Sequence, residues 1–273
     1  DIYLRMAKDR GLRIGYVIET HIHADFVSGA QALAKRTGAQ IIGGRTGAYE
    51  FELRQVSGGE TIELGQATLQ VMHTPGHTPE HISLQLFDAQ QGDQPIALFT
   101  GDTLFNLDVG RPDLLGEGSE RELAGALYHT LFDHYLPLGD RIEIYPCHGA
   151  GSACGKTIGD RRPSTLGSER LFNPALREQR SEDEFIDWLL ADMPEPPRHY
   201  ARLKQLNVRS AVQMEGASLP PPLAPSEFET LAARGMQVVD VRSILAFGGG
   251  HVPGAINIAL RNEFVNWAGW MLD

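Results

Sequence analysis

Four short turns that carry potential metal ligands follow runs of β-forming residues at widely separated points of the chain. Histidine nitrogens and carboxylate oxygens bind transition metals, and a cleft at the ends of neighbouring strands can hold such side chains together. If the four runs are neighbouring strands, the chain must fold so that their ends meet around one site. The turns contain His21-Ile22-His23-Ala24-Asp25, Pro75-Gly76-His77, Gly101-Asp102 and Cys147-His148-Gly149.

The apolar pattern along the chain changes from alternating helix and strand to consecutive strands. Residues 14–18 predict a buried strand, residues 29–36 a helix that ends at Gly38, and residues 40–42 the next strand. Three later segments alternate apolar and polar residues, as strands of an antiparallel sheet covered on one face do. These segments are 61–64, 68–72 and 82–86, followed by expected strands at 96–99 and 141–145 and an amphipathic helix at 120–136.

A length of 273 residues exceeds one typical domain. A helix is expected from 182 to about 192, and the proline-rich stretch 219–225 predicts a linker, because proline favours extended chain. We expect a main domain at 1–170, a helical extension and linker at 171–218, and a partial second domain at 219–273. The remainder after the linker is short for an independent core, so we expect the chain to be cut inside that domain, and the first sheet to lack upstream strands.

Composition excludes several partners. The formal net charge of -11 argues against nucleic acid or an anionic membrane, which require clustered Lys and Arg, and favours a small-molecule substrate. No apolar run approaches the ~20 residues of a membrane span. Two cysteines, Cys147 and Cys154, do not make a disulfide framework, so a reducing, cytoplasmic location is the simpler interpretation. Both cysteines are interpreted as small residues of a tight loop, and a homo-oligomer stays an open alternative.

Each ligand candidate also has a simpler interpretation. The first motif could be a polar turn, His77 and His148 could be ordinary turn histidines, and Asp102 could cap the segment after it. Four such groups in the same setting favour a metal site. His73 and His81 lack this framing, and we expect no special role for them.

The order of these motifs resembles that of the metallo-β-lactamase superfamily over roughly residues 1–170. The resemblance implies an α/β fold of the αβ/βα sandwich type, with two sheets face to face, helices outside and the metal at one edge. Members with two metals, such as glyoxalase II and the lactamases, place a histidine directly after the Asp of the first motif. That position is Phe26 here, and a phenyl ring has no lone pair for a metal, so a single-metal site is expected.

The chain further resembles the persulfide dioxygenase branch through Gly110-Arg111-Pro112-Asp113. The resemblance implies one Fe²⁺ per chain held by His21, His77 and Asp102, a two-histidine, one-carboxylate set typical of oxygen-activating non-heme iron. His23, Asp25 and His148 would then have catalytic roles, hydrogen-bonding metal-bound water or orienting ligands. The same ligands can hold Zn²⁺.

The activity implied by this resemblance is oxidation of a low-molecular-weight thiol persulfide, such as glutathione persulfide, by O₂ to sulfite and thiol. Arg111 is expected to bind a substrate carboxylate or, equally, to pair with Asp113. One alternative is a zinc-dependent thioester hydrolase of the glyoxalase II type. Another is a non-catalytic sulfur-handling module in which the metal only stabilises the fold.

Two motifs after the linker resemble a rhodanese domain, namely Val239-Asp240-Val241-Arg242 and Gly250-His251-Val252-Pro253-Gly254. Rhodanese sulfurtransferases work through a cysteine thiolate, and no cysteine follows Cys154. We therefore expect residues 219–273 to be a partial rhodanese-like α/β domain that does not itself transfer sulfur. An unrelated βα unit with a Gly-Pro turn is the alternative.

Overall fold

The computed structural model describes residues 2–116, 118–161, 163–209, 220–261 and 263–272. The chain divides into two compact units, the first comprising Asp1–Pro196 with Tyr200–Val212 and the second Pro197–His199 with Gln213–Asp273. The boundary predicted between residues 218 and 219 lies outside the described residues, so the domain limits stay a prediction.

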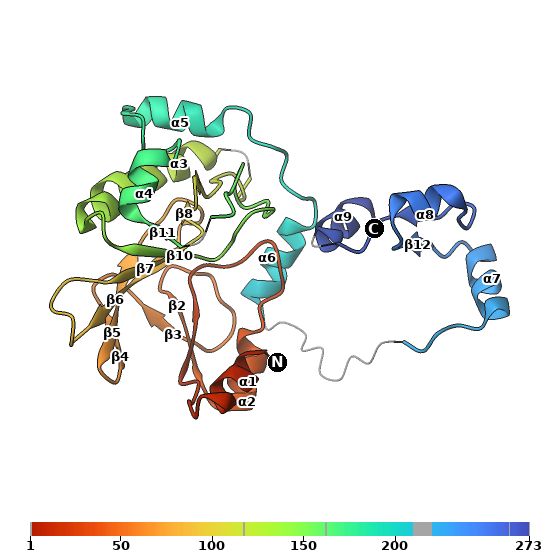
Figure 1. Ribbon diagram of the computed structural model, residues 1–273, viewed down its shortest axis with the longest axis horizontal. Helices are drawn as coiled ribbons and strands as arrows, with labels where there is room; N and C mark the ends of the chain where they lie inside the picture. Colours follow the sequence, from red (N-terminus) through yellow and green to blue (C-terminus); the bar gives the residue numbers. More distant parts are fainter. Residues whose placement is uncertain (1, 117, 162, 210–219, 262, 273) are drawn as a thin grey trace. The chain divides into compact units, whose positions relative to one another are not determined.

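Two larger β-sheets form the centre of the first unit (Figure 1). The smaller sheet holds β1 (Tyr16–Glu19), β2 (Gln40–Gly44) and β3 (Arg54–Val56), all parallel. The larger sheet has the strand order β11-β10-β7-β6-β5-β4, in which β4 to β7 are antiparallel neighbours and β10 runs parallel to β7. Its strands are β4 (Thr61–Leu64), β5 (Ala67–His73), β6 (Ile82–Asp88), β7 (Ala97–Gly101), β10 (Glu143–Pro146) and β11 (Ser164–Thr165).

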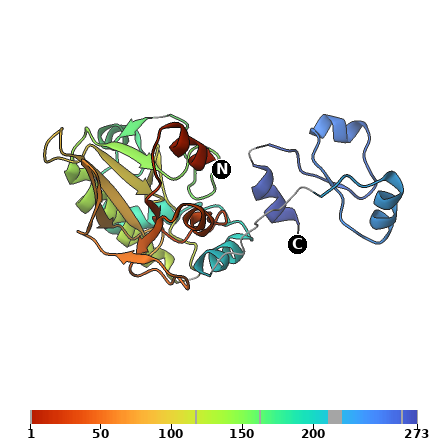
Figure 2. The same ribbon diagram turned by 90° about the horizontal axis from the view of Figure 1, so that it is seen from below.

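Helices lie on the outside of both sheets. In Figures 1 and 2, α3, α4 and α5 lie on one side of the larger sheet, while α1 and α2 lie beside the smaller sheet. The expected metallo-β-lactamase type of α/β fold is therefore confirmed. The other elements of this unit are a short hairpin of β8 (Leu104–Phe105) and β9 (Asp108–Val109), and α1 (Ile2–Asp9), α2 (Ala30–Thr37), α3 (Glu120–His129), α4 (Leu166–Phe172), α5 (Glu182–Leu190) and α6 (Tyr200–Val208).

The larger sheet buries apolar side chains on both faces, because successive residues of a strand point to opposite sides. One face packs on the smaller sheet, where Ile62 and Val71 meet Ile42 and Val56. The other face packs on the helices. There Leu98 and Ile144 join Leu127 of α3 and Phe185 of α5 in a second core. This double burial fixes the sheet in the middle of the unit and leaves the strand ends free to carry the ligands.

The helix expected at residues 120–136 is shorter than predicted. Helix α3 ends at His129, and the chain continues as a π-helix, Thr130–Tyr135, and a 3₁₀ turn, Leu136–Leu138. Pro137 has no N–H for a helical hydrogen bond and lies in the 3₁₀ turn, so it accounts for the end of the whole helical segment but not for the change to a π-helix at Thr130. The apolar periodicity of the sequence does not distinguish the wider turn from an α-helix.

The second unit contains a parallel pair of short strands, β12 (Val239–Asp240) and β13 (Ile256–Asn257). Arg242 pairs with Asp240, and its Nη2 donates to the carbonyl of Gly250 at 2.8 Å, so the two predicted motifs contact each other. The rhodanese-like assignment stays a prediction. The helices of this unit are α7 (Pro225–Ala233), α8 (Ile244–Gly249) and α9 (Phe264–Met271).

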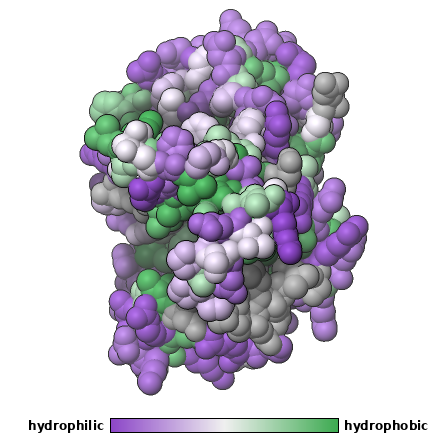
Figure 3. All heavy atoms as spheres, turned by 90° about the vertical axis from the view of Figure 1, so that its right-hand side faces the viewer, coloured by the Kyte–Doolittle hydropathy of each residue, from purple (hydrophilic) through white to green (hydrophobic). Residues whose placement is uncertain are grey.

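Hydrophobic residues are widely exposed on this second unit, with Leu245 at 85% and Leu260 at 71% relative exposure. Figure 3 shows one face of the molecule, on which hydrophobic residues, in green, gather among hydrophilic ones. Within the described ranges, every helix is too short or too polar to cross a bilayer.

Replacing Leu127 by Ala should lower the free energy of unfolding of the first unit by about 2–5 kcal/mol, because it leaves a cavity in the core under α3. Urea denaturation followed by circular dichroism measures the change. Leu171→Ala in α4 is the control, since this side chain is 67% exposed and its loss should cost under about 0.5 kcal/mol. Equal effects of the two substitutions would contradict the assignment of the core.

Candidate metal centre

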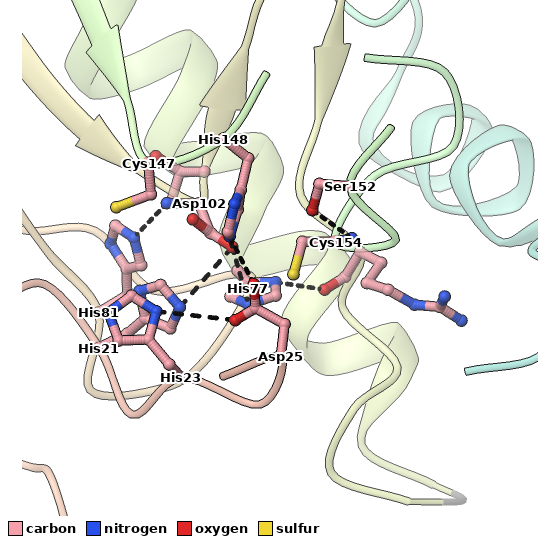
Figure 4. A network of polar contacts seen from close by, with 12 residues as sticks. His21, His23, Asp25, His77, His81, Asp102, Cys147, His148, Ser152 and Cys154 are labelled. Atoms are coloured by element: carbon pink, nitrogen blue, oxygen red, sulfur yellow. Dashed lines mark hydrogen bonds and ion pairs between the residues drawn. The ribbon is translucent and has the colours of Figure 1, made fainter. Parts of the chain in front are cut away.

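The four ligand-bearing turns meet at one place in the first unit (Figure 4). His21 follows β1, His77 lies in the turn between β5 and β6, Asp102 follows β7 and His148 follows β10. One potential ligand atom from each of His21, His77 and Asp102 lies within 4.8 Å of the other two. Strand ends thus bring together residues that are far apart in the sequence, and a metal-binding His/Asp site is present.

The three side chains converge on a buried point. His21 Nε2 lies 3.7 Å and His77 Nε2 3.6 Å from Asp102 Oδ2, and all three residues are at most 1% exposed. Within the described part of the chain, no hydrogen bond of acceptable geometry reaches His21 Nε2 or either carboxylate oxygen of Asp102. A buried carboxylate that lacks hydrogen bonds of good geometry is costly, and a cation between these atoms reduces that cost. The donor set therefore fits a transition-metal ion.

The backbone orients His77 for this role. His77 Nδ1 lies 2.8 Å from the carbonyl oxygen of Arg111. A carbonyl only accepts, so Nδ1 carries the proton and the lone pair of Nε2 faces Asp102. Gly76 precedes it at φ +150, and a Cβ there would lie 2.6 Å from Cβ of Leu127. Glycine is needed because the turn passes directly against α3.

Burial sets the charge states of the cluster. Burial lowers the pKa of His21 well below its usual range and also lowers that of His77, so both rings are neutral at neutral pH and keep a free lone pair. Burial acts to raise the pKa of Asp102, but His21 and His148 outweigh it and hold the carboxyl well below its usual range. Two neutral imidazoles and one carboxylate are the protonation states that a metal requires.

The three residues with expected catalytic roles lie around this cluster. His148 Nε2 lies 3.3 Å from Asp25 Oδ2 and 3.2 Å from Asp102 Oδ2, and His23 Nε2 lies 3.4 Å from Glu19 Oε2. Burial lowers the pKa of His148, but the Asp102 carboxylate, 3.2 Å from its Nε2, reverses the shift, so the pKa is raised. In His23, burial is likewise outweighed by Glu19, and the pKa is raised. These two rings therefore hold protons more readily than the ligand histidines.

Cys154 lies closer to the site than its interpretation as a small loop residue indicated. Its thiol, with Asp25 and His148, forms a second group of potential ligand atoms within 4.8 Å of one another. It is 1% exposed, and burial raises the pKa of the thiol well above its usual range, so the neutral thiol is the form present without a metal. Phe26 packs its ring 4.4 Å from that of His23 and is 42% exposed.

Arg111 does not lie open to a substrate. It is 1% exposed, and its Nε and Nη2 donate to the two carboxylate oxygens of Asp113, each at 2.7 Å. Nη2 and Nη1 also reach the carbonyls of Pro194 and Ala153. The guanidinium is therefore used within the protein, which favours the ion pair with Asp113 and leaves the expected substrate-binding role of Arg111 without support. Its carbonyl instead orients His77.

Sequence reasoning missed two residues that hold the site together. His81 is fully buried and accepts a hydrogen bond from the backbone N–H of Asp102 at 2.9 Å. Its position four residues after His77, at the start of an expected strand, was the available signal. Asn207 donates to the carbonyls of His23 and Phe26 and accepts from the N–H of Ser28. No local pattern marks a partner that lies 184 residues from His23.

A family model described as the metallo-beta-lactamase superfamily matches residues 3–148. This match covers more than half of the chain, and the fold and the His/Asp site agree with it. The chain belongs to the metallo-β-lactamase superfamily.

Relatives of two activities are similar to this chain. Hydroxyacylglutathione hydrolase of Polaromonas sp. (strain JS666 / ATCC BAA-500) is 31% identical over 74% of this chain and 84% of its own length. Persulfide dioxygenase ETHE1 of Mus musculus is 32% identical over 67% of this chain, which spans only 63% of that protein.

Two solved structures are similar over most of the chain. The crystal structure of a metallo-beta-lactamase from Staphylococcus aureus subsp. aureus COL has a TM-score of 0.88 and 37% identity, covering 99% of this chain and 78% of that one. ETHE1 from Myxococcus xanthus has a TM-score of 0.64 and 29% identity, covering 76% of this chain and 82% of that one.

His77→Ala should abolish high-affinity metal binding while leaving the protein folded, because a catalytic cluster loses one ligand and the two apolar cores stay intact. Metal content by elemental analysis and far-ultraviolet circular dichroism measure the two effects. His73→Ala is the control, since His73 is exposed and its Nε2 contacts only the carbonyl of Pro79 at 2.8 Å among the contacts described. Global unfolding of His77→Ala would point to a purely structural metal.

Arg111→Ala should lower the free energy of unfolding by about 3 kcal/mol or more, because it leaves the Asp113 carboxylate and two carbonyls without their donor. Arg121→Ala is the matched control: Arg121 also pairs with an aspartate, Asp187, at 2.7 Å, but both side chains are exposed, so the loss of stability should be much smaller. Unchanged stability of Arg111→Ala with a raised KM would restore the substrate-binding role.

Proposed function

We propose that this chain is an iron-dependent persulfide dioxygenase that oxidises a low-molecular-weight thiol persulfide, such as glutathione persulfide. In the overall reaction the persulfide, O₂ and one water give the thiol and sulfurous acid, present as sulfite. The terminal sulfur loses four electrons and O₂ gains them. The observation that carries the proposal is the buried set of His21, His77 and Asp102, with a phenyl ring at position 26.

The ligand set favours iron for an oxidation. Two neutral imidazoles and one carboxylate form the set that non-heme Fe²⁺ oxygenases use. When bound, ferrous iron supplies the redox chemistry and the open coordination positions that allow O₂ to react with sulfur. His21, His77 and Asp102 would hold it, and Phe26 adds no ligand. The persulfide dioxygenase name of the mouse relative supports the same activity.

The surrounding residues can hold a proton beside the metal centre and provide an apolar surface next to it. His148 lies between Asp25 and Asp102, and its raised pKa lets Nε2 hold a proton that the departing thiolate can take. Ala24, Phe105, Cys154 and Tyr200 form an apolar cluster beside this group, and the ring centroids of Phe105 and His148 are 6.0 Å apart. Apolar surroundings limit water, which protects a reactive sulfur species from side reactions.

A zinc-dependent thioester hydrolase is the second candidate. The hydroxyacylglutathione hydrolase relative matches over 84% of its length, a larger share than for the dioxygenase of mouse. The same three ligands hold Zn²⁺ equally well by their chemistry. The two candidates differ in their use of O₂, which makes them separable by experiment.

The second unit would extend the proposed function. If residues 219–273 are part of a rhodanese-like domain, they would place a sulfur-handling fold in the same chain as the first unit, but they contain no cysteine and would not transfer sulfur themselves. The contact of Arg242 with Asp240 and Gly250 gives the two motifs a shared local structure, which supports the assignment.

Protein purified without oxygen should contain about one equivalent of iron and consume one O₂ per glutathione persulfide. An oxygen electrode and sulfite determination measure the two stoichiometries, and Asp102→Ala should show neither metal nor O₂ uptake. His73→Ala serves again as the folded control with full activity. One equivalent of zinc, no O₂ uptake and hydrolysis of S-lactoylglutathione would establish the hydrolase instead.

A further inference from the structure

A chain of buried hydrogen bonds starts at the backbone of Asp102 and returns to the same turn. The Asp102 N–H donates to His81 Nε2 at 2.9 Å, and His81 Nδ1 lies 2.9 Å from the hydroxyl of Thr74. The path continues through side-chain hydroxyls that are all buried. Its further contacts are Thr74 to Ser83 at 2.9 Å, Ser83 to Tyr135, Tyr135 to Thr103 at 2.6 Å, and Thr103 to the carbonyl of Thr100 at 2.7 Å.

The direction of every bond is determined by the two ends. At one end, the carbonyl of Thr100 accepts the only proton of the Thr103 hydroxyl, so Tyr135 must donate to Thr103. The same reasoning makes Ser83 donate to Tyr135 and Thr74 donate to Ser83. The remaining contact then requires a proton on Nδ1 of His81.

The other end gives the same answer independently. The Asp102 N–H is a donor, so His81 Nε2 must be unprotonated and accept from it. His81 is therefore neutral, with its proton on Nδ1 and its lone pair occupied. Both ends of the chain of hydrogen bonds therefore require the same tautomer of His81.

The ring of His81 also fixes the shape of the Asp102 turn. Gly101 adopts φ +53, and a Cβ there would lie 2.3 Å from His81 Nε2. The ring lies parallel to that of His21, with centroids 5.2 Å apart and an interplanar angle of 19°. One side chain thus contacts two of the three metal-ligand candidates, as Figure 4 shows for His81, His21 and Asp102.

We infer that His81 is a positioning residue, which holds the Asp102 turn and is itself kept from binding the metal because both ring nitrogens are engaged. This inference rests on the metal site of the proposed function. It explains why His81, although its ring stacks on that of His21 and its Nε2 contacts the Asp102 backbone, is not part of the ligand set. The donor chain beyond His81 selects the tautomer.

Tyr135→Phe tests the inference at a position that contacts no ligand candidate. Removing its hydroxyl breaks the chain in the middle, and the affinity for Zn²⁺ should fall by about 10–100-fold. His81→Phe should show at least the same loss. Competition with a chromophoric chelator measures the affinity on the folded fraction, which is determined by circular dichroism.

Tyr128→Phe is the matched control. Tyr128 lies in α3 and donates a long, 3.3 Å hydrogen bond to the carbonyl of Arg180, away from the turn. It should keep wild-type affinity. Wild-type affinity in both Tyr135→Phe and His81→Phe would overturn the inference.

Nitrogen NMR of the imidazole rings gives a second readout. The resonances of His81 should show a protonated Nδ1 before and after Zn²⁺ is added, whereas Nε2 of His21 and His77 should shift on binding. A metal-induced shift of His81 Nε2, or absence of any Zn²⁺ binding, would overturn the inference. Because zinc replaces iron and no turnover is measured, loss of the dioxygenase proposal alone would leave these results unaffected.

Discussion

The carboxylate of Asp102 is the constraint on which the rest of the site depends. It is fully buried, and both its oxygens lack a hydrogen bond of acceptable geometry within the described chain. A protein tolerates this arrangement only where positive charge is supplied. Neutral His21 and His77 supply lone pairs rather than charge. His148 Nε2 lies 3.2 Å from Oδ2 and its pKa is raised, so it supplies part of the positive charge, and a metal ion would supply the rest. The apolar cores on the two faces of the larger sheet stabilise the fold and allow it to bury this polar cluster.

Local sequence patterns predicted most of the fold and the turns that meet at the metal centre, whereas the choice of His21, His77 and Asp102 as the ligands came from the family resemblance and stays a prediction. The alternation in 61–64, 68–72 and 82–86 indicates three antiparallel strands, and β4, β5 and β6 are such strands. The ligand-bearing turns were visible because glycine, proline and histidine recur directly after apolar runs. The Gly76 turn shows why: the sequence needs glycine there since α3 leaves no room for a Cβ.

The parts that the sequence did not predict depend on contacts between distant segments. The Gly110-Arg111 motif is visible in the sequence, but one acceptor for the guanidinium, the carbonyl of Pro194, lies 83 residues away. His81 reads as an ordinary strand residue until Asp102 and Tyr135 are placed beside it. The hydroxyl of Tyr135 reaches its partners from a π-helical turn. The apolar pattern of this segment in the sequence cannot be distinguished from that of an α-helix. Such features follow from packing in three dimensions, and residue spacing alone does not predict them.

Asn207 connects helix α6 to the loop that carries His21, His23 and Asp25. Its side chain joins the carbonyls of His23 and Phe26 to the N–H of Ser28, and it is only 6% exposed. Three backbone groups of the first ligand loop therefore obtain their partners from a helix that follows the lactamase-like segment. Dissecting the protein at the edge of the family match would expose those groups and release the loop. Fragments made for study should retain α6, and exchange of this helix between homologues offers a means of retuning the loop without altering any ligand.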